Sequence, residues 1–594
     1  MNILGIGDHV SCGAAILRDG VFSSVLIDER LVREKMVFGV PREGIARNLE
    51  LSGLKPGDID RVAIATVNQH LIDHYVDFRE GWFGLDRGRV KQIIFDAASK
   101  VAPGMRFMPW LPHAYYLVRA PFFAQRRRAW RRILRDEFGI HAPVEFVDHH
   151  YCHTTSAYFA SGFDDCLSVS IDGGGDGLSA CVYDIRNGRM RRVHAVRSYD
   201  SLGVFYSYIT QLCGFKAGRH EGKVTGLAAR GEPRYVDALR RLMRFENGTI
   251  RNIGGMFFKS GLERIRALLP PDFDRADLAA SIQVFTEDVA TAFIRHWLDQ
   301  TGHTKVALSG GLFANVAVNR RIHELPGVEE VFVFPGMSDE GMPVGAALAA
   351  CYDHPESRPA ERRLSMNHVY LGPEFSDDEI AGALREAGVA AERCPEVEKT
   401  IARLLADGKV VARFNGRMEY GPRALGNRSI LYQPNDPSVN DWLNDALQRT
   451  EFMPFAPATL WEAADRCYEG VEGARNTARF MTITFMCTPW MRKHCAGVVH
   501  VDGTARPQLV REEDNPSFYR IIDEYRKLTG IPSIINTSFN MHEEPIVCTP
   551  SDAIRAFKLG HLDYLAIGNY VAENPVPMAR PKPAARERVA ALGS

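Results

Sequence analysis

The sequence has no marked excess of either charge. Its 72 lysines and arginines nearly balance 73 aspartates and glutamates, and the formal net charge is −1. Since bulk attraction to nucleic acid or to an anionic membrane needs a clear positive excess, the composition argues against nucleic acid as a partner. The chain also has no uninterrupted apolar run long enough to span a bilayer, so we expect no membrane partner.

Cysteine pairs and a secretory leader are missing as well. The eleven cysteines are scattered and never spaced as CxxC, which argues against a disulfide framework and a cysteine-rich zinc module. The segment Met1–Asp8 has no basic start, apolar run or small-residue cleavage site, and we interpret it as a first strand and turn. We therefore expect a reduced, cytoplasmic protein. The chain also lacks a repeat typical of a solenoid or propeller.

What is present is the composition of a globular protein, with 45% hydrophobic and 24% charged residues. At 594 residues the chain is too long for one ordinary core. Strand-like segments such as Arg61–Ala65 and Cys166–Ile171 alternate with helix-like segments through the first half. This alternation predicts an α/β architecture.

A polar, proline-containing stretch at residues 354–363 precedes a second α/β run. Such stretches commonly link domains. We therefore predict a first domain at residues 1–360 and a second at residues 366–575. Residues 576–594 contain prolines, arginines and alanines with no clear apolar period, and we predict that they form a flexible tail.

Between residues 72 and 138 the alternation gives way to aromatic- and arginine-rich helical material, which we interpret as an insertion. We expect it to border a substrate pocket, because insertions on a scaffold commonly set specificity. A surface helical hairpin or a homodimer contact is the alternative. The insertion contains the basic run Gln125–Arg132. We interpret this run as a solvated helix face, with phosphate or RNA binding as the alternative.

Two histidines, His149 and His153, stand four residues apart after a strand-like segment at residues 144–147. On a helix, residues i and i+4 share a face, so both imidazoles can reach one metal ion. Taken alone, however, a pair of histidines that caps or lines a helix is the better explanation.

Three turns in the same half strengthen the case for a site. They are Asp172–Gly173–Gly174, Ser309–Gly310–Gly311 and Ser338–Asp339. Glycine permits positive φ and leaves backbone N–H groups open to a phosphate, and the helix near Asn315 offers its N-terminus to one. A tight turn explains any one of them, whereas three in one domain favour a split nucleotide site.

The second half contains a different pattern. Three arginines, Arg417, Arg423 and Arg428, stand among glycines and a proline after a strand-like segment. A rigid loop of this kind suits bidentate binding of phosphates, although an ordinary turn explains any single arginine. Further along, the strand-like segment Ile534–Asn540 ends in small hydroxyl and amide side chains suited to a triphosphate or a carbamoyl group.

Together these motifs resemble the O-carbamoyltransferase family of antibiotic and nodulation-factor biosynthesis. The segments that carry the resemblance are His149–His153, Asp172–Gly177, Lys223–Ala228, Ser309–Asn315, Ser338–Gly341, Gly416–Ser429, Phe452–Pro457, His500–Gln508 and Asn536–Asn540. The resemblance covers nearly the whole chain, apart from the tail and part of the insertion. It implies an actin/sugar-kinase-like N-terminal domain, similar to the tRNA threonylcarbamoyl transferases, and an α+β YrdC-like C-terminal domain.

The resemblance also implies cofactors and their ligands. In the family an Fe(2+) ion is bound, and the matching residues are His149, His153, Asp172 and Asp339. Nitrogen and carboxylate ligands suit iron, manganese or zinc alike, so another divalent metal stays open. ATP with Mg(2+) is the second cofactor. Residues expected to bind the nucleotide and donor are Gly173, Gly174, Lys223, Ser309, Gly310, Gly311, Asn315, Arg417, Arg449, Thr504 and Asn536.

Six residues are expected to act in catalysis: His9, Lys35, Arg423, Arg428, Arg506 and Ser538. The arginines would neutralise phosphates, and Ser538 would position the carbamoyl donor. His9 is a candidate to contact the acceptor or take its proton, although relatives have His-Asp where this chain has His9-Val10. Lys35 matches a basic position near the family's active site. Ahead of Pro454 the usual lysine is missing, and of the usual basic residues only Arg449 remains.

The implied reaction has two stages. Carbamoyl phosphate and ATP would form carbamoyl-adenylate in the C-terminal domain, with loss of phosphate and pyrophosphate. The N-terminal domain would then transfer the carbamoyl group to a hydroxyl of a small-molecule acceptor, with the metal as Lewis acid. The acceptor pocket is the one that the insertion is expected to border.

Two other classes of function were considered. A threonylcarbamoyl-type tRNA-modifying enzyme disagrees with the near-neutral charge and with the presence of both catalytic halves in one chain. A non-catalytic nucleotide-binding protein disagrees with the clustered metal-type ligands and arginines. The sequence leaves the acceptor open among aminoglycosides, macrolides, nucleosides and sugars.

Overall fold

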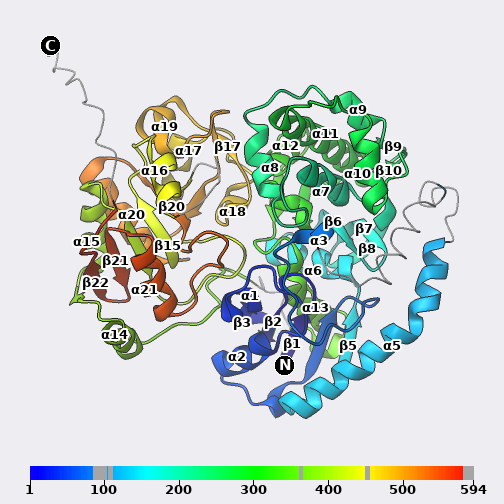
Figure 1. Ribbon diagram of the computed structural model, residues 1–594. Coiled ribbons are helices and arrows are strands. Elements are labelled where there is room, and N and C mark those ends of the chain that lie inside the picture. The colour runs from blue at the N-terminus through cyan, green and yellow to red at the C-terminus, as the bar shows by residue number, and fades with distance from the viewer. Residues whose placement is uncertain (85–103, 105–110, 360–365, 448–454, 579–594) are drawn as a thin grey trace.

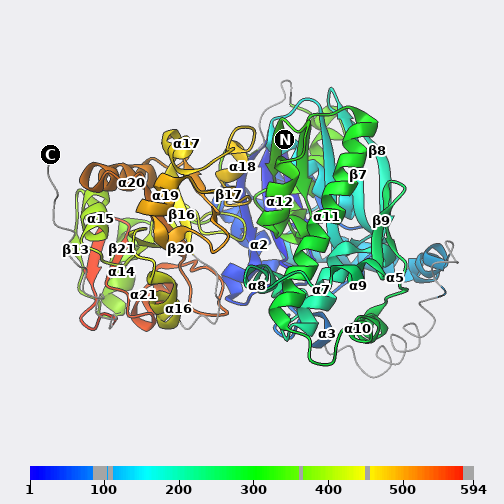
Figure 2. The same ribbon diagram turned by 90° about the horizontal axis from the view of Figure 1, so that it is seen from above.

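The computed structural model describes residues 1–84, 104, 111–359, 366–447 and 455–578. Two lobes lie side by side in both views (Figures 1 and 2). The first lobe, blue to green, contains the chain up to residue 352, and the second, yellow-green to red, contains the residues after 365. The predicted linker at 354–363 lies partly outside the described residues, as does nearly all of the predicted tail.

The first lobe begins with a five-stranded sheet in the order β3-β2-β1-β4-β5. Its strands are β1 (Asn2–Gly7), β2 (Gly13–Arg18), β3 (Val21–Ile27), β4 (Arg61–Ala65) and β5 (Val144–Val147). Strands β1, β2 and β3 pair antiparallel, whereas β1, β4 and β5 pair parallel. The apolar residues of β1 alternate between the two faces of the sheet, since Ile3 and Leu4 belong to different cores.

A second five-stranded sheet repeats this arrangement. Its strands are β6 (Cys166–Gly175), β7 (Leu178–Arg186), β8 (Arg189–Arg197), β11 (Lys305–Ser309) and β12 (Glu330–Val333), in the order β12-β11-β6-β7-β8. Strands β6, β7 and β8 are antiparallel, and β6, β11 and β12 are parallel. Two sheets with the same order and directions form the duplicated architecture of the actin and sugar-kinase fold. The predicted fold of the N-terminal domain is therefore confirmed.

Two helices fill the space between the sheets: α6 (His149–Ser161) and α13 (Met342–Tyr352). They pack against each other at very short range, because a Cβ atom on Gly345 would lie only 2.0 Å from the carbonyl oxygen of Cys152. Helix α6 is thereby fixed against the core, and its first turn lies at the ends of β6 and β11, which it also contacts.

The outer faces of the sheets are covered by the remaining helices of the lobe. They are α1 (Asp28–Val32), α2 (Arg42–Ser52), α3 (Gly81–Gly84), α5 (Leu111–Phe138), α7 (Leu202–Leu212), α8 (Glu221–Ala228), α9 (Val236–Arg240), α10 (Phe258–Arg266), α11 (Arg275–Thr301) and α12 (Val316–His323). Helices α7, α11 and α12 cover the second sheet, and α2 and α5 cover the first. A small ribbon of β9 (Met243–Glu246) and β10 (Thr249–Asn252) lies beside them.

Helix α5 belongs to the predicted insertion and runs along the edge of the first lobe (Figure 1). Its apolar residues Trp130, Ile133 and Leu134 pack into the core of the first sheet. The interpretation of the basic run as a solvated face agrees with the exposed Arg128, Arg131 and Arg132. It is wrong for Arg126, which is only 1% exposed, because this arginine lies on the same helix face as Trp130.

The second lobe is built on one mixed sheet of eight strands in the order β13-β22-β21-β14-β15-β20-β16-β19. The strands are β13 (Glu392–Arg393), β14 (Val411–Phe414), β15 (Arg428–Tyr432), β16 (Ala456–Leu460), β19 (Gln508–Val510), β20 (Ser533–Ser538), β21 (Tyr564–Ile567) and β22 (Tyr570–Glu573). A ribbon of β17 (Phe485–Met486) and β18 (Thr504–Ala505) is separate. Parallel and antiparallel pairs occur together, so the predicted α+β class is confirmed.

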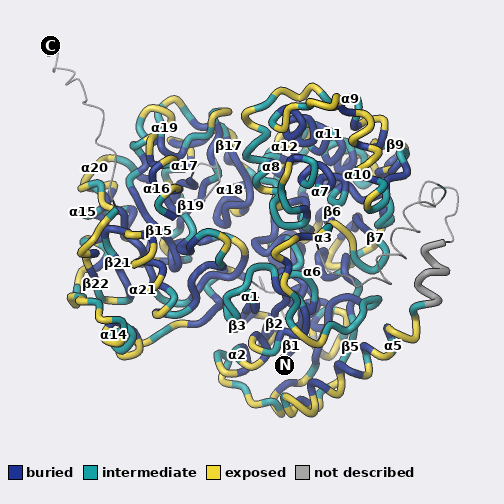
Figure 3. The backbone as a smooth tube through the Cα atoms, viewed as in Figure 1, coloured by how far each residue is buried: buried dark blue, intermediate teal, exposed yellow. Residues whose placement is uncertain are grey.

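Helices cover both faces of this sheet. They are α14 (Asp377–Glu386), α15 (Val397–Ala406), α16 (Val439–Ala446), α17 (Ala464–Cys467), α18 (Arg475–Ala478), α19 (Pro489–His494), α20 (Pro516–Thr529) and α21 (Pro550–Leu559). Helices α15 and α20 pack on one face and α14, α16 and α21 on the other. Figure 3 shows the buried backbone concentrated inside the two lobes and where they meet. Among the described residues, no helix has the length and apolar character needed to cross a bilayer.

Candidate active site

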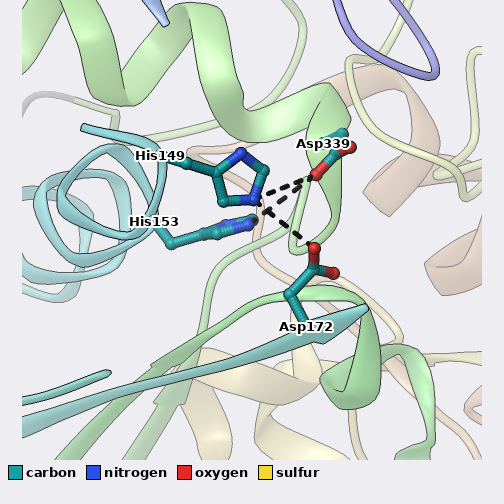
Figure 4. Close-up of side chains that lie close together, drawn as sticks. All are labelled: His149, His153, Asp172 and Asp339. Carbon is teal, nitrogen blue, oxygen red and sulfur yellow. Dashed lines mark ion pairs between the residues drawn. The ribbon is translucent and has the colours of Figure 1, made fainter. Parts of the chain in front are cut away.

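Helix α6 presents the two histidines to the interior of the first lobe. The Asp148 side chain caps the helix by accepting a hydrogen bond from the Tyr151 N–H at 2.9 Å, which fixes where the helix begins. His149 and His153 therefore lie one turn apart on the same face, and both are fully buried. Figure 4 shows both rings turned toward the same point.

The two aspartates reach this point from separate segments of the chain. Asp172 lies near the end of β6, and Asp339 lies in the turn after β12. The Gly311 N–H donates a hydrogen bond of 2.9 Å to Asp172. The preceding residue, Gly310, has φ +108° and no room for a side chain, because a Cβ atom would lie 2.3 Å from the Ile171 carbonyl oxygen. The glycine turn thus places a backbone donor against Asp172.

The four side chains form one compact cluster (Figure 4). His149 Nε2 lies 3.4 Å from Asp172 Oδ2 and 3.7 Å from Asp339 Oδ1, and His153 Nε2 lies 3.8 Å from Asp339 Oδ1. One ligand atom of each residue lies within 4.8 Å of every other. Around a single ion with bonds of about 2.0–2.2 Å, ligand atoms lie roughly 3–3.5 Å apart, so a slight contraction would complete the geometry.

The cluster fits a metal ion for two further reasons. His149 Nε2, His153 Nε2 and Asp339 Oδ1 are buried and have no hydrogen-bond partner in the described protein. Burial and the neighbouring Asp172 raise the pKa of Asp339 to about 8, and burial together with His149 holds the pKa of His153 well below its usual range. A cation at the centre would stabilise the Asp339 carboxylate, and the neutral form of His153 is the form that binds a metal ion.

The outward-facing ring nitrogens of the two histidines contact hydroxyl groups. Ser309 Oγ lies 3.0 Å from His153 Nδ1, and Thr66 Oγ1 lies 3.4 Å from His149 Nδ1. Such contacts orient a metal-binding imidazole so that its Nε2 atom faces the ion. Ser309 was predicted to bind the nucleotide, but its hydroxyl contacts His153 and the Met337 carbonyl. Thr66 was not predicted, because no motif surrounds it.

His9 lies at the same cluster, as expected for a residue of the site. Its Nδ1 atom is 3.7 Å from Asp339 Oδ2, and its ring centroid is 5.1 Å from that of His149. Burial and the neighbouring His149 lower the pKa of His9 to about 3, so the ring is neutral at physiological pH. Lys35 lies in the loop after α1, between that helix and α2.

The arginines of the second lobe divide into two kinds. Arg428 donates to the carbonyl oxygens of Asn415, Gly416, Asn427 and Pro373, and its guanidinium lies 3.7 Å from the Phe414 ring centroid. Arg417 likewise donates to the carbonyl oxygens of Gly372, Leu371 and Ser23. Most donors of these two side chains therefore bind backbone carbonyl groups, and the phosphate contact expected of both stays a prediction.

Arg423 and Arg506 behave differently. Within the part of the chain that the structure describes, neither guanidinium has a hydrogen-bonded or ion-paired partner, and Arg423 Nε is buried. Burial lowers the pKa of both groups, and the proximity of Arg423 lowers that of Arg506 further. Two desolvated cations beside each other need an anion, which is the property expected of a phosphate site.

Glu419, which the sequence analysis missed, shapes this arginine loop. Its carboxylate is fully buried and accepts hydrogen bonds from the Leu425 N–H at 2.6 Å and the Arg428 N–H at 3.2 Å. Asn536 lies beneath the loop, where its amide donates to the carbonyl oxygen of Ala424 and to Gln508. An acidic residue between arginines carries no signal of this role in the sequence.

The other predicted residues lie in several places. Gly173 faces open space and Gly174 has φ +151°. Asn315 caps α12 and exchanges hydrogen bonds with Gln283. Lys223 Nζ lies 3.6 Å from Glu543 of the second lobe. The Ser538 hydroxyl donates to Asn540, and the Thr504 hydroxyl to Asp502. Arg449 lies outside the described residues.

The two groups of residues adjoin where the lobes meet. The Tyr420 hydroxyl, from the arginine loop, donates to the carbonyl oxygen of Glu340, which follows Asp339 in the chain. The Glu340 carboxylate is close enough to Arg423 to favour its charged form. The loop that carries Arg423 is therefore in contact with the turn that carries Asp339 and Glu340.

Family models match both lobes. A model described as carbamoyltransferase N-terminus matches residues 2–348, and one described as carbamoyltransferase C-terminus matches residues 402–574. Nodulation protein NolNO of Sinorhizobium fredii is 31% identical over 94% of this chain and 78% of its own length. An uncharacterized protein of Methanocaldococcus jannaschii is 33% identical over 96% of this chain and 99% of its own.

Solved structures resemble part of the chain only loosely. Full-length HypF in its phosphate- and nucleotide-bound form covers 59% of this chain and 46% of its own, at 14% identity and a TM-score of 0.34. Component A of (R)-2-hydroxyglutaryl-CoA dehydratase from Acidaminococcus fermentans covers 59% and 96%, at 15% identity and a TM-score of 0.32. Scores this low support no conclusion, so the fold assignment rests on the strand order.

Proposed function

The chain belongs to the carbamoyltransferase family, and on that premise we propose that it is an O-carbamoyltransferase. It makes carbamoyl-adenylate from carbamoyl phosphate and ATP, and it transfers the carbamoyl group to a hydroxyl of a small-molecule acceptor. One observation carries the proposal: the turn that carries Asp339 of the buried histidine–aspartate cluster is hydrogen-bonded to the loop that carries the unpaired Arg423. Two unlike sites in contact suit a reaction with two stages.

The arginine site suits the first stage. Arg423 and Arg506 are desolvated and form no direct ion pair among the described residues, so they favour an anionic ligand. ATP with Mg(2+) and carbamoyl phosphate both supply phosphate groups that guanidinium ions bind well. Water releases phosphate from carbamoyl phosphate, and the carbamate oxygen then attacks the α-phosphorus of ATP with loss of pyrophosphate. The arginines stabilise the negative charge on both departing groups.

The histidine–aspartate cluster suits the second stage. His149, His153, Asp172 and Asp339 would hold a divalent metal, for which iron(II), manganese and zinc all match the donors. When bound, the metal supplies Lewis-acid polarisation of the carbamoyl donor. The side chains of the two aspartates are 11% and 15% exposed, so this edge of the cluster is the one through which substrates reach it.

His9 is the candidate base of the transfer. Its Nδ1 atom lies 3.7 Å from Asp339 Oδ2, so the ring is at the cluster where the acceptor hydroxyl would lose its proton. The acceptor hydroxyl attacks the carbamoyl carbon, its proton passes to His9, and AMP leaves. The direct contact between the lobes keeps the reactive adenylate away from water between the two stages.

The proposal is tested with the wild-type protein. Carbamoyl phosphate should be required for exchange of labelled pyrophosphate into ATP in the presence of Mg(2+). A panel of aminoglycosides, macrolides, nucleosides and sugars is then screened by mass spectrometry for addition of one carbamoyl group. Absence of both exchange and product under metal-replete conditions would refute the proposal, and modification of tRNA instead would indicate a threonylcarbamoyl-type enzyme.

A further inference from the structure

Arg126, the buried arginine of α5, forms a closed ion pair with Asp8 at the end of the first strand. Arg126 Nη2 lies 2.8 and 2.9 Å from the two carboxylate oxygens, and Nε lies 3.1 Å from one of them. One turn later, Trp130 Nε1 donates to the same carboxylate at 2.9 Å. The side chains of Arg126 and Asp8 are 0% and 2% exposed. Removing either partner of such a buried ion pair strongly destabilises the folded protein, because the other charge stays buried without a partner.

The same guanidinium also holds the end of β4. Arg126 Nη1 donates to the Thr66 carbonyl oxygen at 2.8 Å, and Nη2 to the Ala65 carbonyl oxygen at 3.1 Å. Thr66 has φ +71°. A β-branched residue is strained at positive φ and keeps that conformation only where its surroundings enforce it. Arg126 supplies part of that enforcement by binding two successive carbonyl groups.

Thr66 in turn contacts two imidazoles of the candidate active site. Its Oγ1 atom lies 2.6 Å from His9 Nε2 and 3.4 Å from His149 Nδ1. Both contacts turn the opposite edges of the rings, His9 Nδ1 and His149 Nε2, toward Asp339. His9 is therefore fixed twice, through its chain neighbour Asp8 and through the Thr66 hydroxyl.

We propose that Arg126 is a positioning residue of the transfer site. Through Asp8 and Thr66 it fixes the orientation of His9 and of the candidate metal ligand His149. The insertion helix α5 thereby helps to shape the site. This inference rests on the proposed function, because it assigns the positioning to the metal cluster and its acceptor.

The test uses two substitutions and a matched control. Thr66→Val keeps the side-chain shape and removes the hydroxyl, whereas Arg126→Lys keeps the charge but not the fork of donors. Arg135→Lys is the control, because Arg135 binds Asp136 on the exposed surface of the same helix. The readouts are the affinity and visible spectrum of Co(2+) titrated into metal-free protein, and kcat and KM for carbamoyl transfer.

We expect Thr66→Val and Arg126→Lys to weaken Co(2+) binding about 10- to 100-fold, the range typical of partners of metal ligands. Transfer kcat should fall similarly, while ATP–pyrophosphate exchange and the control keep wild-type values. Thr66→Ser should restore Co(2+) binding. If Arg126→Lys does not fold, Thr66→Val decides alone.

Wild-type Co(2+) affinity and spectrum in folded Thr66→Val would overturn the inference, and so would a loss of stability without any change in metal binding. Because the titration involves no carbamoyl chemistry, its outcome is independent of the proposed function. If the wild-type protein neither exchanges pyrophosphate nor transfers a carbamoyl group, the proposed function is refuted. The positioning inference is then still decided by the Co(2+) titration.

Discussion

The hydroxyl of Tyr420 donates a hydrogen bond of 2.7 Å to the backbone carbonyl oxygen of Glu340, across the boundary between the lobes. Gly336 makes this approach possible, because a Cβ atom there would lie 2.2 Å from the same hydroxyl. Arg30 of the first lobe also donates to the Gly421 carbonyl oxygen at 2.5 Å. The loop that carries Arg423 is thus fixed against the loop that carries Asp339, and we expect two half-reactions that are separable by mutation but close in space.

The first prediction concerns the histidine–aspartate cluster. His153→Ala should abolish carbamoyl transfer to the acceptor, because a nitrogen ligand is lost. Carbamoyl-phosphate-dependent ATP–pyrophosphate exchange should remain near the wild-type rate, since Arg423 and Arg506 are untouched. Both rates are measured on the same metal-replete preparation. Equal loss of both in a folded variant would contradict the separation.

The second prediction is the converse. Arg506→Ala should reduce ATP–pyrophosphate exchange by about 10²- to 10³-fold, because a preorganised charge in a desolvated site is removed. Transfer should return when carbamoyl-adenylate is supplied from outside. A variant that uses neither ATP nor supplied carbamoyl-adenylate would mean that the two sites are one, and a single-centre mechanism would then be required.

The third prediction separates two arginines of the same loop. Arg428→Lys should lower the free energy of unfolding by about 2–3 kcal/mol, because an ammonium ion cannot reproduce hydrogen bonds to several carbonyl groups. Arg423→Lys should leave stability unchanged and slow the exchange reaction about 10²-fold. Thermal unfolding and exchange rates are compared for the two variants. If Arg428→Lys slowed exchange without loss of stability and Arg423→Lys lowered stability instead, Arg428 would be the phosphate ligand.

The fourth prediction concerns the packing of α6 on α13. Gly345→Ala places a methyl group 2.0 Å from the Cys152 carbonyl oxygen, and overpacking of this kind typically destabilises by about 1–3 kcal/mol. Gly57→Ala is the control, because nothing lies within 4 Å of a Cβ atom there. A lowered melting temperature and weaker metal binding are expected only for Gly345→Ala. Similar unfolding of both variants would show that α13 does not position the histidines.

The fifth prediction concerns pH. Burial raises the pKa of Asp28 to about 7 despite hydrogen bonds from the Tyr75 hydroxyl and the Gly44 N–H. The folded state therefore binds a proton more tightly than the unfolded state, whose aspartate titrates near pH 4. This contribution to stability is complete below about pH 4 and is lost as the pH rises to about 7, with a slope of at most about 1.4 kcal/mol per unit.

Asp28→Asn should remove this slope, because the amide is neutral at every pH. The measurement is urea unfolding of both proteins between pH 4 and 8. A wild-type stability that rises with pH over this range by an amount that Asp28→Asn abolishes would show that Asp28 is ionised in the folded state.

The sequence by itself determined the class of the protein and the kinds of residue in its site. Alternating strand and helix patterns indicated an α/β first lobe, since side-chain periodicity reflects which face is buried. His149 and His153 could be placed on one helix face because residues i and i+4 share a face, and the resemblance to the family then identified them as metal ligands. These are local properties, so no knowledge of distant contacts was needed.

Only the tertiary structure decided which polar groups are available. Arg423 and Arg428 stand in one loop and look alike in sequence, yet one guanidinium binds carbonyl groups and the other has no partner in the described chain. Arg126 belongs to a run of arginines but is buried against Asp8, from which it is 118 residues distant. Hydrogen bonding and burial depend on what folding brings near a side chain, and residue type alone does not specify that.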